Sequence, residues 1–433
     1  MQLLKTIEKF FKTKIGKFCR KNYITIILAA ILIFSFTTKV YHVAKIKDYI
    51  FDEVYVRFTA EEFAKGNMKA WVWDYIAPKG FAYCWSHPPL GKLIMAGFLK
   101  ILGFSVFVVR LPAVLAGVLI SFMVFLLAKF LFPKDPQIWL IAAFLASIEG
   151  LLLVLSRIGL ADTMLCLFLL STIYFMLKKK YLISSVFFGM SISIKWTSIY
   201  FAILLIIFLF KETKWDKNLK NITHKLVNIF LTGLIYIFMA LGIYLLSYSL
   251  FFTSGYGMEK FIHLQKQMYW YHTGLTATHP YQSPAISWPI DYRPVWFWVD
   301  YQNETTSNIF ALGNPLIFWV GFLSAFFTLG FYIISRQKKL LYLLIAYAIF
   351  WVPWIFSPRC MFLYHYLPAI PYLCLILAFA LNIISKSDKR LKFLPYIFLA
   401  LAFFNFIFFY PYWTGMPVAK NAVKQFQWFT TWK

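Results

Sequence analysis

The chain has 433 residues, of which 61% are hydrophobic, 21% aromatic and only 14% charged. Its mean hydropathy of +0.68 is far above that of soluble globular proteins and is typical of a multi-pass membrane protein. The formal net charge of +26 comes from short basic clusters that separate apolar segments. Such clusters are typical of topology determinants and argue against a nucleic-acid-binding face.

A helix needs about 20 apolar residues to cross the hydrocarbon core of a bilayer. By that criterion we predict an all-α fold with about eleven membrane-spanning helices, near residues 23–41, 107–132, 137–155, 159–177, 181–195, 196–210, 226–252, 311–335, 340–357, 361–384 and 393–410. The fifth and sixth are short, so we expect a tilt or a break around Lys195-Trp196. The first follows a long basic segment without a small-residue cleavage site, which indicates a retained helix rather than a removed signal peptide.

Lysine and arginine gather in alternate loops, which the positive-inside rule places in the cytoplasm together with the N-terminus. The basic loops are Lys5–Lys21, Lys129 to Lys134, Lys178–Lys180, Lys211–Lys225, Arg336–Lys339 and Lys386–Lys392. The loops expected outside hold most of the Pro, Trp, Tyr, His and acidic residues; they are 42–106, 156–158, 253–310, 357–360 and 411–433. In the first of them, Val54 to Phe63 has the helical alternation of an interfacial helix.

These assignments divide the chain into three regions. We expect a basic cytoplasmic N-terminus at 1–22 and a transmembrane domain at 23–410. That domain would carry a catalytic outer loop at 42–106 and a second outer loop at 253–310. An outer C-terminal tail would follow at 411–433.

Asp52 and Glu53 stand side by side shortly after the first predicted span, in a chain with only 17 acidic residues. Carboxylates at a membrane surface repel each other and carry a desolvation cost. We interpret the pair as a general base or a substrate-orienting carboxylate; two solvated loop acids are the alternative. The pair could also bind a divalent cation, but no dedicated ligand cluster accompanies it, so no metal site is predicted.

Several basic residues fall on the same predicted side. His87 precedes two prolines that stiffen the backbone, and Lys92 follows at the start of a helix; a plain turn is the alternative. Arg110 lies in apolar sequence near the outer surface, where an arginine either snorkels or binds a phosphate. Lys195 interrupts an apolar run, and an intramembrane lysine suggests a functional site unless it snorkels.

Arg157 and Asp162 are spaced for an ion pair within one helix, and we expect a structural role for Asp162. Arg359 and His365 flank the start of a later span. The outer loop 253–310 is aromatic and proline-stiffened, which suits sugar stacking and phosphate contact, although interfacial aromatic belts are an alternative. Its candidate residues are His279, Tyr281, Ser283, Trp288 and Arg293.

The five cysteines show no CxxC pair. Cys166 and Cys374 lie in apolar runs and are expected to be small core residues. Cys84 and Cys360 are both expected outside, and their spacing does not decide whether they pair.

One carboxylate pair and several cations on one face suit the transfer of a group from an anionic lipid. The cations would hold a phosphate leaving group, while a carboxylate takes the proton of the incoming nucleophile. A transporter or flippase is an alternative, but it should show inverted repeats and midplane polar residues.

In their order along the chain, these residues resemble the protein O-mannosyltransferase family, which has a GT-C fold and resembles glycosyltransferase family 39. The resemblance covers nearly the whole chain. It rests on Asp52-Glu53, HPPLGK at 87–92, Arg110, SRIGLAD at 156–162, Lys195-Trp196, HPYQS at 279–283, WP…RP at 288–294 and PRCMFLYHYLPA at 358–369. It implies about eleven helices, an inner N-terminus and an outer active site.

The family reaction transfers mannose from dolichyl-phosphate mannose, or a polyprenyl equivalent, to Ser or Thr hydroxyls of translocated proteins. By resemblance, Asp52 would be the general base, Glu53 would position the acceptor, and Arg110 would hold the lipid phosphate with help from Lys195. The mechanism would be a single inverting displacement. The other residues assigned to the donor site are His87, Lys92, Arg157, Trp196, Arg293, Arg359 and His365.

The chain departs from the family pattern in two places. Trp85 stands where the family commonly has an acidic residue, two positions before His87. The loop 253–310 is too short for the β-trefoil domain that eukaryotic members insert, so the chain resembles a minimal prokaryotic member of the plasma membrane. A transferase of the same fold that acts on a lipid or glycan acceptor is an alternative function. For the oligomeric state, a homodimer and a heterodimer are both open.

Overall fold

The computed structural model describes residues 14–433 apart from 214, 216, 217 and 275. The first thirteen residues of the predicted N-terminal region therefore lie outside the described part of the chain. The helices are α2 Lys14–Val40, α3 Val56–Ala64, α4 Leu90–Leu102, α5 Val106–Leu131, α6 Pro136–Ser147, α7 Gly150–Leu155, α8 Asp162–Leu177, α9 Tyr181–Ile192, α10 Phe201–Glu212, α11 Leu219–Ser247, α12 Ser249–Thr253, α13 Met258–Gly274, α14 Pro315–Ser335, α15 Lys338–Ile349, α16 Ile370–Ser387 and α17 Leu394–Thr414.

The described residues contain seven helical segments that are long and apolar enough to cross a membrane. They correspond to α2, α5, α11, α14, α15, α16 and α17, in three cases extended by an adjoining 3₁₀ turn. The shorter helices α6, α8 and α9 are also apolar, and α10 carries the apolar sequence FAILLIIFLF. Together they account for the eleven predicted spans, and the chain is a multi-pass membrane protein.

The break predicted at Lys195-Trp196 is confirmed. Helix α9 ends at Ile192, and Lys195 has extended backbone angles of φ −146° and ψ 137° before the 3₁₀ helix η3, Trp196–Tyr200, leads into α10. A second break separates α6 from α7, where Glu149 caps α7 by accepting hydrogen bonds from the N–H groups of Leu151 and Leu152. A carboxylate suits that position because the first N–H groups of a helix have no partner within it.

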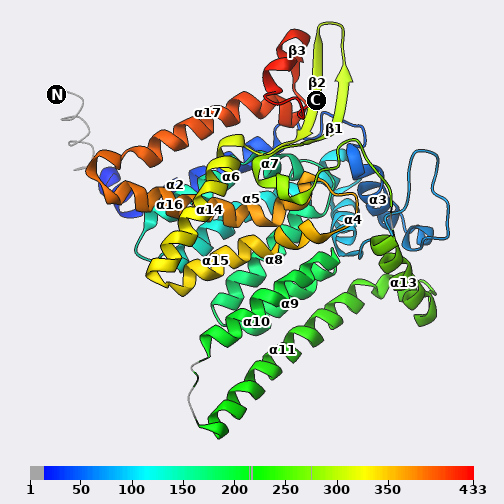
Figure 1. Cartoon of the computed structure of the whole chain (residues 1–433). Helices are drawn as coiled ribbons and strands as arrows, with labels where there is room; N and C mark the ends of the chain where they lie inside the picture. Colours follow the sequence, from blue (N-terminus) through cyan, green and yellow to red (C-terminus); the bar gives the residue numbers. More distant parts are fainter. Residues whose placement is uncertain (1–13, 214, 216–217, 275) are drawn as a thin grey trace.

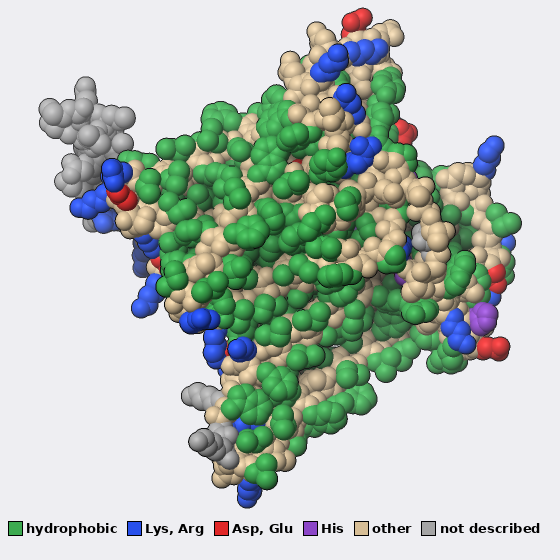
Figure 2. Space-filling model, viewed as in Figure 1, with side chains coloured by type: hydrophobic (Ala, Val, Ile, Leu, Met, Phe, Trp, Pro, Cys, Tyr) green, Lys and Arg blue, Asp and Glu red, His purple; other side chains and the backbone are tan. Residues whose placement is uncertain are grey.

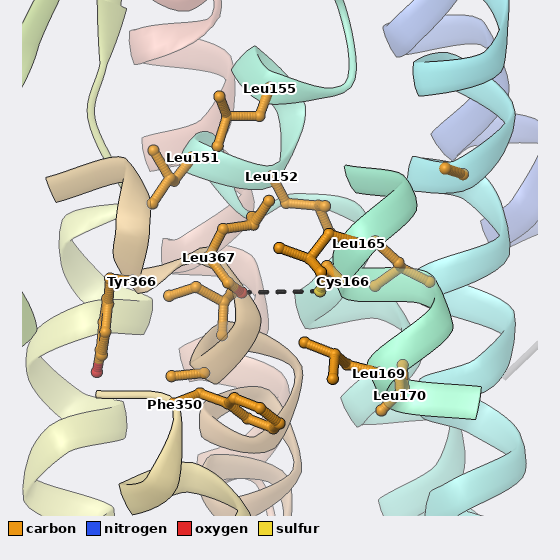
Figure 3. Close-up of a cluster of buried hydrophobic side chains, with 14 of the residues drawn as sticks. Leu151, Leu152, Leu155, Leu165, Cys166, Leu169, Leu170, Phe350, Tyr366 and Leu367 are labelled. Atoms are coloured by element: carbon orange, nitrogen blue, oxygen red, sulfur yellow. Dashed lines mark hydrogen bonds between the residues drawn. The ribbon is translucent and has the colours of Figure 1, made fainter. Parts of the chain in front are cut away.

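The centre of the bundle is a close-packed apolar core formed by α5, α6, α8 and α16 (Figure 1). Figure 3 shows Cys166 of α8 facing the 3₁₀ helix η6, Leu363–Ala369, with its thiol 3.8 Å from the carbonyl oxygen of Leu367. Leucines of α7 and α8 surround this contact. Cys166 and Cys374 are both buried, as expected for small core residues.

The two ends of the bundle differ in chemistry. At the left in Figure 1, contacts join the predicted cytoplasmic loops to one another: Lys386 pairs with Asp135, and Lys179 and Lys338 both pair with Glu212. Figure 2 shows Lys and Arg gathered along this edge, with a hydrophobic belt beside it. The loops predicted to lie outside meet at the opposite end, around α3, α4 and α13.

A three-stranded antiparallel sheet at this second end was not predicted. Its strands are β1 Val295–Tyr301, β2 Thr305–Ala311 and β3 Pro417–Ala419, in the order β1-β2-β3. The run VWFWVDY has strand propensity, but interfacial aromatic residues occur at membrane surfaces in any conformation. The fold is therefore helical throughout the membrane part, with a small sheet added outside it.

Candidate active site

The segment between α2 and α3 places its two acids in different surroundings. Glu53 is fully buried. Its carboxylate accepts two hydrogen bonds of 2.7 Å from Arg110 and one each from the backbone N–H groups of Ile50 and Gly159. Arg57 adds an ion pair at 3.4 Å. Glu53 thus ties the loop to α5 and to the segment between α7 and α8.

Asp52 lies in the short 3₁₀ helix η1, Phe51–Val54, directly after a strained residue. Phe51 has a φ of +50°, which is unfavourable for a bulky side chain. Its ring stacks on Phe297 with centroids 4.3 Å apart. An irregularity in the pairing of β1 with β2, between Trp296 and Trp298, coincides with Phe297. A bulge of this kind re-aims a side chain, and here the stacked ring holds the backbone turn that presents Asp52.

The carboxylate of Asp52 faces a mixed-charge cluster. Tyr364 donates a hydrogen bond of 3.3 Å to its Oδ2 atom. Nearby, Lys195 and Asp162 form an ion pair at 2.7 Å. Burial raises the pKa of Asp52 to about 6; the charge of Lys195 lowers it and that of Asp162 raises it. A carboxylate with a pKa near neutrality is a stronger base than an ordinary aspartate.

A second cluster lies beside the first. His272, at the end of α13, has its Nε2 atom 2.7 Å from the Ser86 carbonyl and its Nδ1 atom 2.6 Å from Nη1 of Arg359. Since the arginine must donate, Nδ1 accepts and Nε2–H donates to the carbonyl, so the ring is neutral. Burial and Arg359 lower the pKa of His272 to about 4. The ring of His87 is 4.9 Å away.

Arg359 also keeps an unused donor. Its Nε atom is buried and has no hydrogen-bond partner among the described residues. A buried unpaired donor is costly and often indicates a ligand site. Lys195 influences Asp52, His87, His272 and His365 electrostatically, so both clusters surround one locus.

Trp196 links this locus to α11 and α13. Its indole N–H donates to the hydroxyl of Tyr244 at 3.1 Å, and that hydroxyl donates to Gln265 at 2.6 Å. The hydrogen-bonded chain crosses from η3 to α11 and on to the helix that carries His272.

Two predicted site residues, Arg110 and Glu53, form hydrogen bonds with each other and with nearby backbone groups. Arg110 is 1% exposed, and its five N–H groups are all taken: three by the carbonyls of Val43, Ile46 and Asp48 and two by Glu53. It therefore has no donor left for a lipid phosphate. Glu53, for which the resemblance implies a role in positioning the acceptor, has a buried carboxylate that already accepts hydrogen bonds from Arg110 and from two backbone N–H groups.

Arg157 and Lys92 brace the backbone. Arg157 donates to the carbonyls of Thr38, Lys39 and Tyr41 at the C-terminal end of α2. The expected ion pair between Arg157 and Asp162 is not formed, because Asp162 pairs with Lys195 across the helix break. Lys92 donates to the carbonyls of Cys84 and His87 and so holds the loop before α4.

The residues predicted from loop 253–310 form a supporting layer. Arg293 donates to the carbonyl of Pro280 and lies over the ring of Tyr281. Trp288 donates to Ser283 and stacks near His365, with centroids 6.2 Å apart. The ring of His279 meets Phe362 edge-on. None of these contacts reaches Asp52 directly, although the layer packs against the segment that carries Tyr364, through Phe362 and His365.

Sequence reasoning missed His272 as a site residue, and it noted Tyr364 beside His365 without assigning it a role. His272 is one of seven histidines and belongs to no recognised motif. Its place in a loop predicted to lie outside was the only signal. Tyr364 is adjacent to His365, but a tyrosine in an aromatic run is not distinctive. Cys84 and Cys360 are both free thiols. The described residues contain no group of three His, Cys, Asp or Glu side chains that could hold a metal ion.

Two family models match the chain. The model of the dolichyl-phosphate-mannose-protein mannosyltransferases matches residues 86–242. The model of the C-terminal four-helix region of protein O-mannosyltransferases matches residues 257–432. The two matches are consecutive and both describe the same family.

Individual relatives are distant. Dolichyl-phosphate-mannose–protein mannosyltransferase 1 of Saccharomyces cerevisiae is 29% identical over 198 residues, which is 40% of this chain and 24% of that protein. The polyprenol-phosphate-mannose–protein mannosyltransferase of Corynebacterium glutamicum is 22% identical over 424 residues, covering 80% of this chain and 81% of the relative. The match thus spans about a quarter of the yeast protein but most of the bacterial one.

The fold is shared with solved structures. The Saccharomyces cerevisiae protein O-mannosyltransferase Pmt1-Pmt2 complex bound to the sugar donor has a chain with TM-score 0.76 at 15% identity, covering 95% of this chain and 93% of that one. ArnT from Cupriavidus metallidurans has a TM-score of 0.57 at 13% identity, covering 86% and 62%. The two consecutive family matches, with the shared GT-C fold, show that the chain belongs to the protein O-mannosyltransferase family.

Proposed function

We propose that the chain transfers mannose from a polyprenyl-phosphate carrier to Ser or Thr hydroxyls of secreted or membrane proteins. The observation that carries this proposal is the placement of Asp52 near Lys195, with Arg359 in the neighbouring cluster around His272. The Asp52 carboxylate has a raised pKa of about 6, and Lys195 and Arg359 lie at the same locus. The names of the relatives, which use dolichyl- or polyprenol-phosphate mannose, support the choice of donor.

In the proposed reaction, the acceptor hydroxyl oxygen attacks the anomeric carbon of mannose from the face opposite the phosphate. The bond between that carbon and the phosphate oxygen breaks, and its electron pair leaves with polyprenyl phosphate. Asp52 takes the hydroxyl proton. Lys195 and the free Nε–H of Arg359 would stabilise the charge that develops on the phosphate. His87, Trp196 and His365 would line the same locus.

We also propose an orientation of the helix bundle in the membrane. The basic end of the bundle would face the cytoplasm, following the positive-inside rule. The end with α3, α4 and α13 would be extracytoplasmic, in a prokaryotic plasma membrane. The transmembrane domain would span 23–410, with outer loops at 42–106 and 253–310 and an outer tail at 411–433. A dimer, of identical or related chains, would be consistent with the Pmt1-Pmt2 complex.

The test is mannose transfer by purified protein from radiolabelled polyprenyl-phosphate mannose to a Ser/Thr-rich peptide. We expect Asp52→Asn to lower turnover by about 10²- to 10⁴-fold, since it removes the base and little volume. Asp300→Asn is the matched control, because the Asp300 carboxylate accepts a hydrogen bond from the nearby Gln302 side chain and has no other side-chain partner among the described residues.

Three outcomes separate the alternatives. Wild-type turnover in folded Asp52→Asn would overturn the assignment of the base. Label in a lipid or glycan fraction, with none in peptide, would change the acceptor. If the protein binds the donor but transfers mannose to no acceptor, the alternative of a transporter or flippase would be favoured.

A further inference from the structure

Tyr271, near the end of α13, has a phenol hydroxyl that the proposed reaction leaves without a role. The side chain is half-buried, and its hydroxyl makes no hydrogen bond within the described part of the chain. The indole N–H of Trp85, also half-buried, likewise has no partner among these residues. Because polar groups inside a protein are normally hydrogen-bonded, two such groups side by side are available to a ligand.

The segment that carries Trp85 is tied to η1, which carries the proposed base, and to α3. The N–H of Ala82 donates to the carbonyl of Val54, the last residue of η1, at 3.5 Å. The N–H of Cys84 donates to the hydroxyl of Thr59 in α3 at 2.8 Å. Trp85 therefore borders the part of the chain that presents the proposed base.

Tyr271 lies between Trp85 and Arg359. Its ring meets the ring of Trp85 edge-on, with centroids 5.5 Å apart, and the Cζ atom of Arg359 lies 5.8 Å from its centroid. The next residue, His272, is bonded to the Ser86 carbonyl and to Arg359. The last turn of α13 is thus fixed against both segments, and so is the backbone that carries the phenol.

The charges around Tyr271 connect it to both ends of the proposed reaction. Burial raises the pKa of the phenol, the positive charge of Arg359 lowers that pKa, and the negative charge of Asp52 raises it. The hydroxyl therefore stays protonated at neutral pH and can donate a hydrogen bond. In a single inverting displacement the sugar lies between the attacking hydroxyl and the leaving phosphate. A polar group that is near both the base and the phosphate-binding cation consequently faces the sugar.

We propose that the Tyr271 hydroxyl forms a hydrogen bond with a hydroxyl of the transferred hexose, and that Trp85 holds the phenol ring in position for this contact. Tyr271 is then a residue that determines sugar specificity, and Trp85 is a positioning residue. A donor that lacks the contacted hydroxyl binds less well, because it leaves the phenol without its partner. This inference rests on the proposed function, in which the ligand is a polyprenyl-phosphate hexose.

The experiment measures binding without any acceptor, by titrating the full chain in detergent with polyprenyl-phosphate mannose and, separately, with polyprenyl phosphate. Tyr271→Phe should weaken binding of the mannosyl lipid about three- to tenfold, the range expected for one neutral hydrogen bond, and leave the affinity for polyprenyl phosphate unchanged. Tyr269→Phe is the matched control and should bind both lipids like wild type. Tyr269 is on the same helix and 65% exposed, and its hydroxyl makes no hydrogen bond with any described residue.

Donors that each lack one sugar hydroxyl test the contact itself. For the wild type, one of these deoxy donors should bind more weakly than the full donor, by a factor similar to the loss in Tyr271→Phe. For Tyr271→Phe, that deoxy donor and the full donor should bind alike, because the contact is already absent.

The positioning role of Trp85 has its own readout. Trp85→Ala should lose the same preference for the mannosyl lipid over polyprenyl phosphate, whereas Trp85→Phe, which keeps an aromatic ring beside the phenol, should retain it. In the Tyr271→Phe background, Trp85→Ala should not change that preference further. An unchanged affinity for polyprenyl phosphate in each variant shows that the site is still folded.

An unchanged affinity of Tyr271→Phe for the mannosyl lipid would overturn the proposal. An equal loss for polyprenyl phosphate would overturn it too, because the hydroxyl would then act on the phosphate or on the fold. The same holds if every deoxy donor is disfavoured by Tyr271→Phe as strongly as by wild type. Failure of the proposed function shows separately: the binding preferences would hold, but the wild type would transfer no mannose to peptide.

Discussion

Glu53 and Arg110 lie 57 positions apart in the chain and are joined by two parallel N–H···O bonds of 2.7 Å. The pair is buried at the junction of the segment between α2 and α3 with α5. Because Glu53 is anchored there, its neighbour Asp52 is directed toward Lys195 and Tyr364. One carboxylate of the acidic pair thus holds the loop, and the other is available for chemistry.

This relationship predicts that Glu53→Gln will affect stability more than chemistry. The substitution leaves the Arg110 charge buried without its partner, which typically costs about 3–5 kcal/mol. We expect a lower unfolding temperature and faster limited proteolysis of the segment 42–106, with Asp300→Asn as the unaffected control. A variant with wild-type stability and lost turnover would support the acceptor-positioning role for Glu53.

The pH dependence of transfer should report the pKa of Asp52. A base must be deprotonated to act, so kcat/KM should fall as the pH drops through about 6. Because the charge of Asp162 raises that pKa, Asp162→Asn should move the acid limb to lower pH. The measurement is kcat/KM from pH 4.5 to 8 for both proteins, and an unmoved limb would exclude this coupling.

Tyr364→Phe should shift the same limb in the opposite direction. The hydroxyl donates a hydrogen bond to Asp52, which stabilises the charged carboxylate and lowers its pKa. Without it the acid limb should move to higher pH, by less than the Asp162 effect, since the bond is long at 3.3 Å. A shift to lower pH would show that this hydroxyl does not stabilise the carboxylate.

Gly150 should tolerate no side chain. A Cβ atom there would lie 2.3 Å from the ring of Trp413 and 2.7 Å from the carbonyl oxygen of Leu312. Gly150→Ala should therefore cost about 1–3 kcal/mol through forced displacement of packed groups. Gly97→Ala is the control, because nothing lies within 4 Å of that position and alanine favours a helix by up to about 1 kcal/mol. Equal unfolding temperatures for the two variants would contradict this packing.

The site was predicted in part. Asp52, Lys195, His87 and Arg359 were selected from sequence, and the structure brings them to one locus. Arg110 was selected for the same reason, a lone arginine in apolar sequence, but it serves a buried ion pair. The two cases look alike in sequence because both a phosphate and a partner carboxylate would make a buried arginine favourable.

Apolar periodicity and basic loops were sufficient to predict the membrane-spanning helices and the break at Lys195. Both follow from local properties, the length of an apolar run and the cost of burying charge, so they can be derived residue by residue. The pairing of Asp162 with Lys195 rather than Arg157, the neutral His272 and the bulge that places Phe297 against Phe51 were decided only by tertiary structure. Each depends on which distant segments pack together, and packing selects among partners that are equivalent in local sequence.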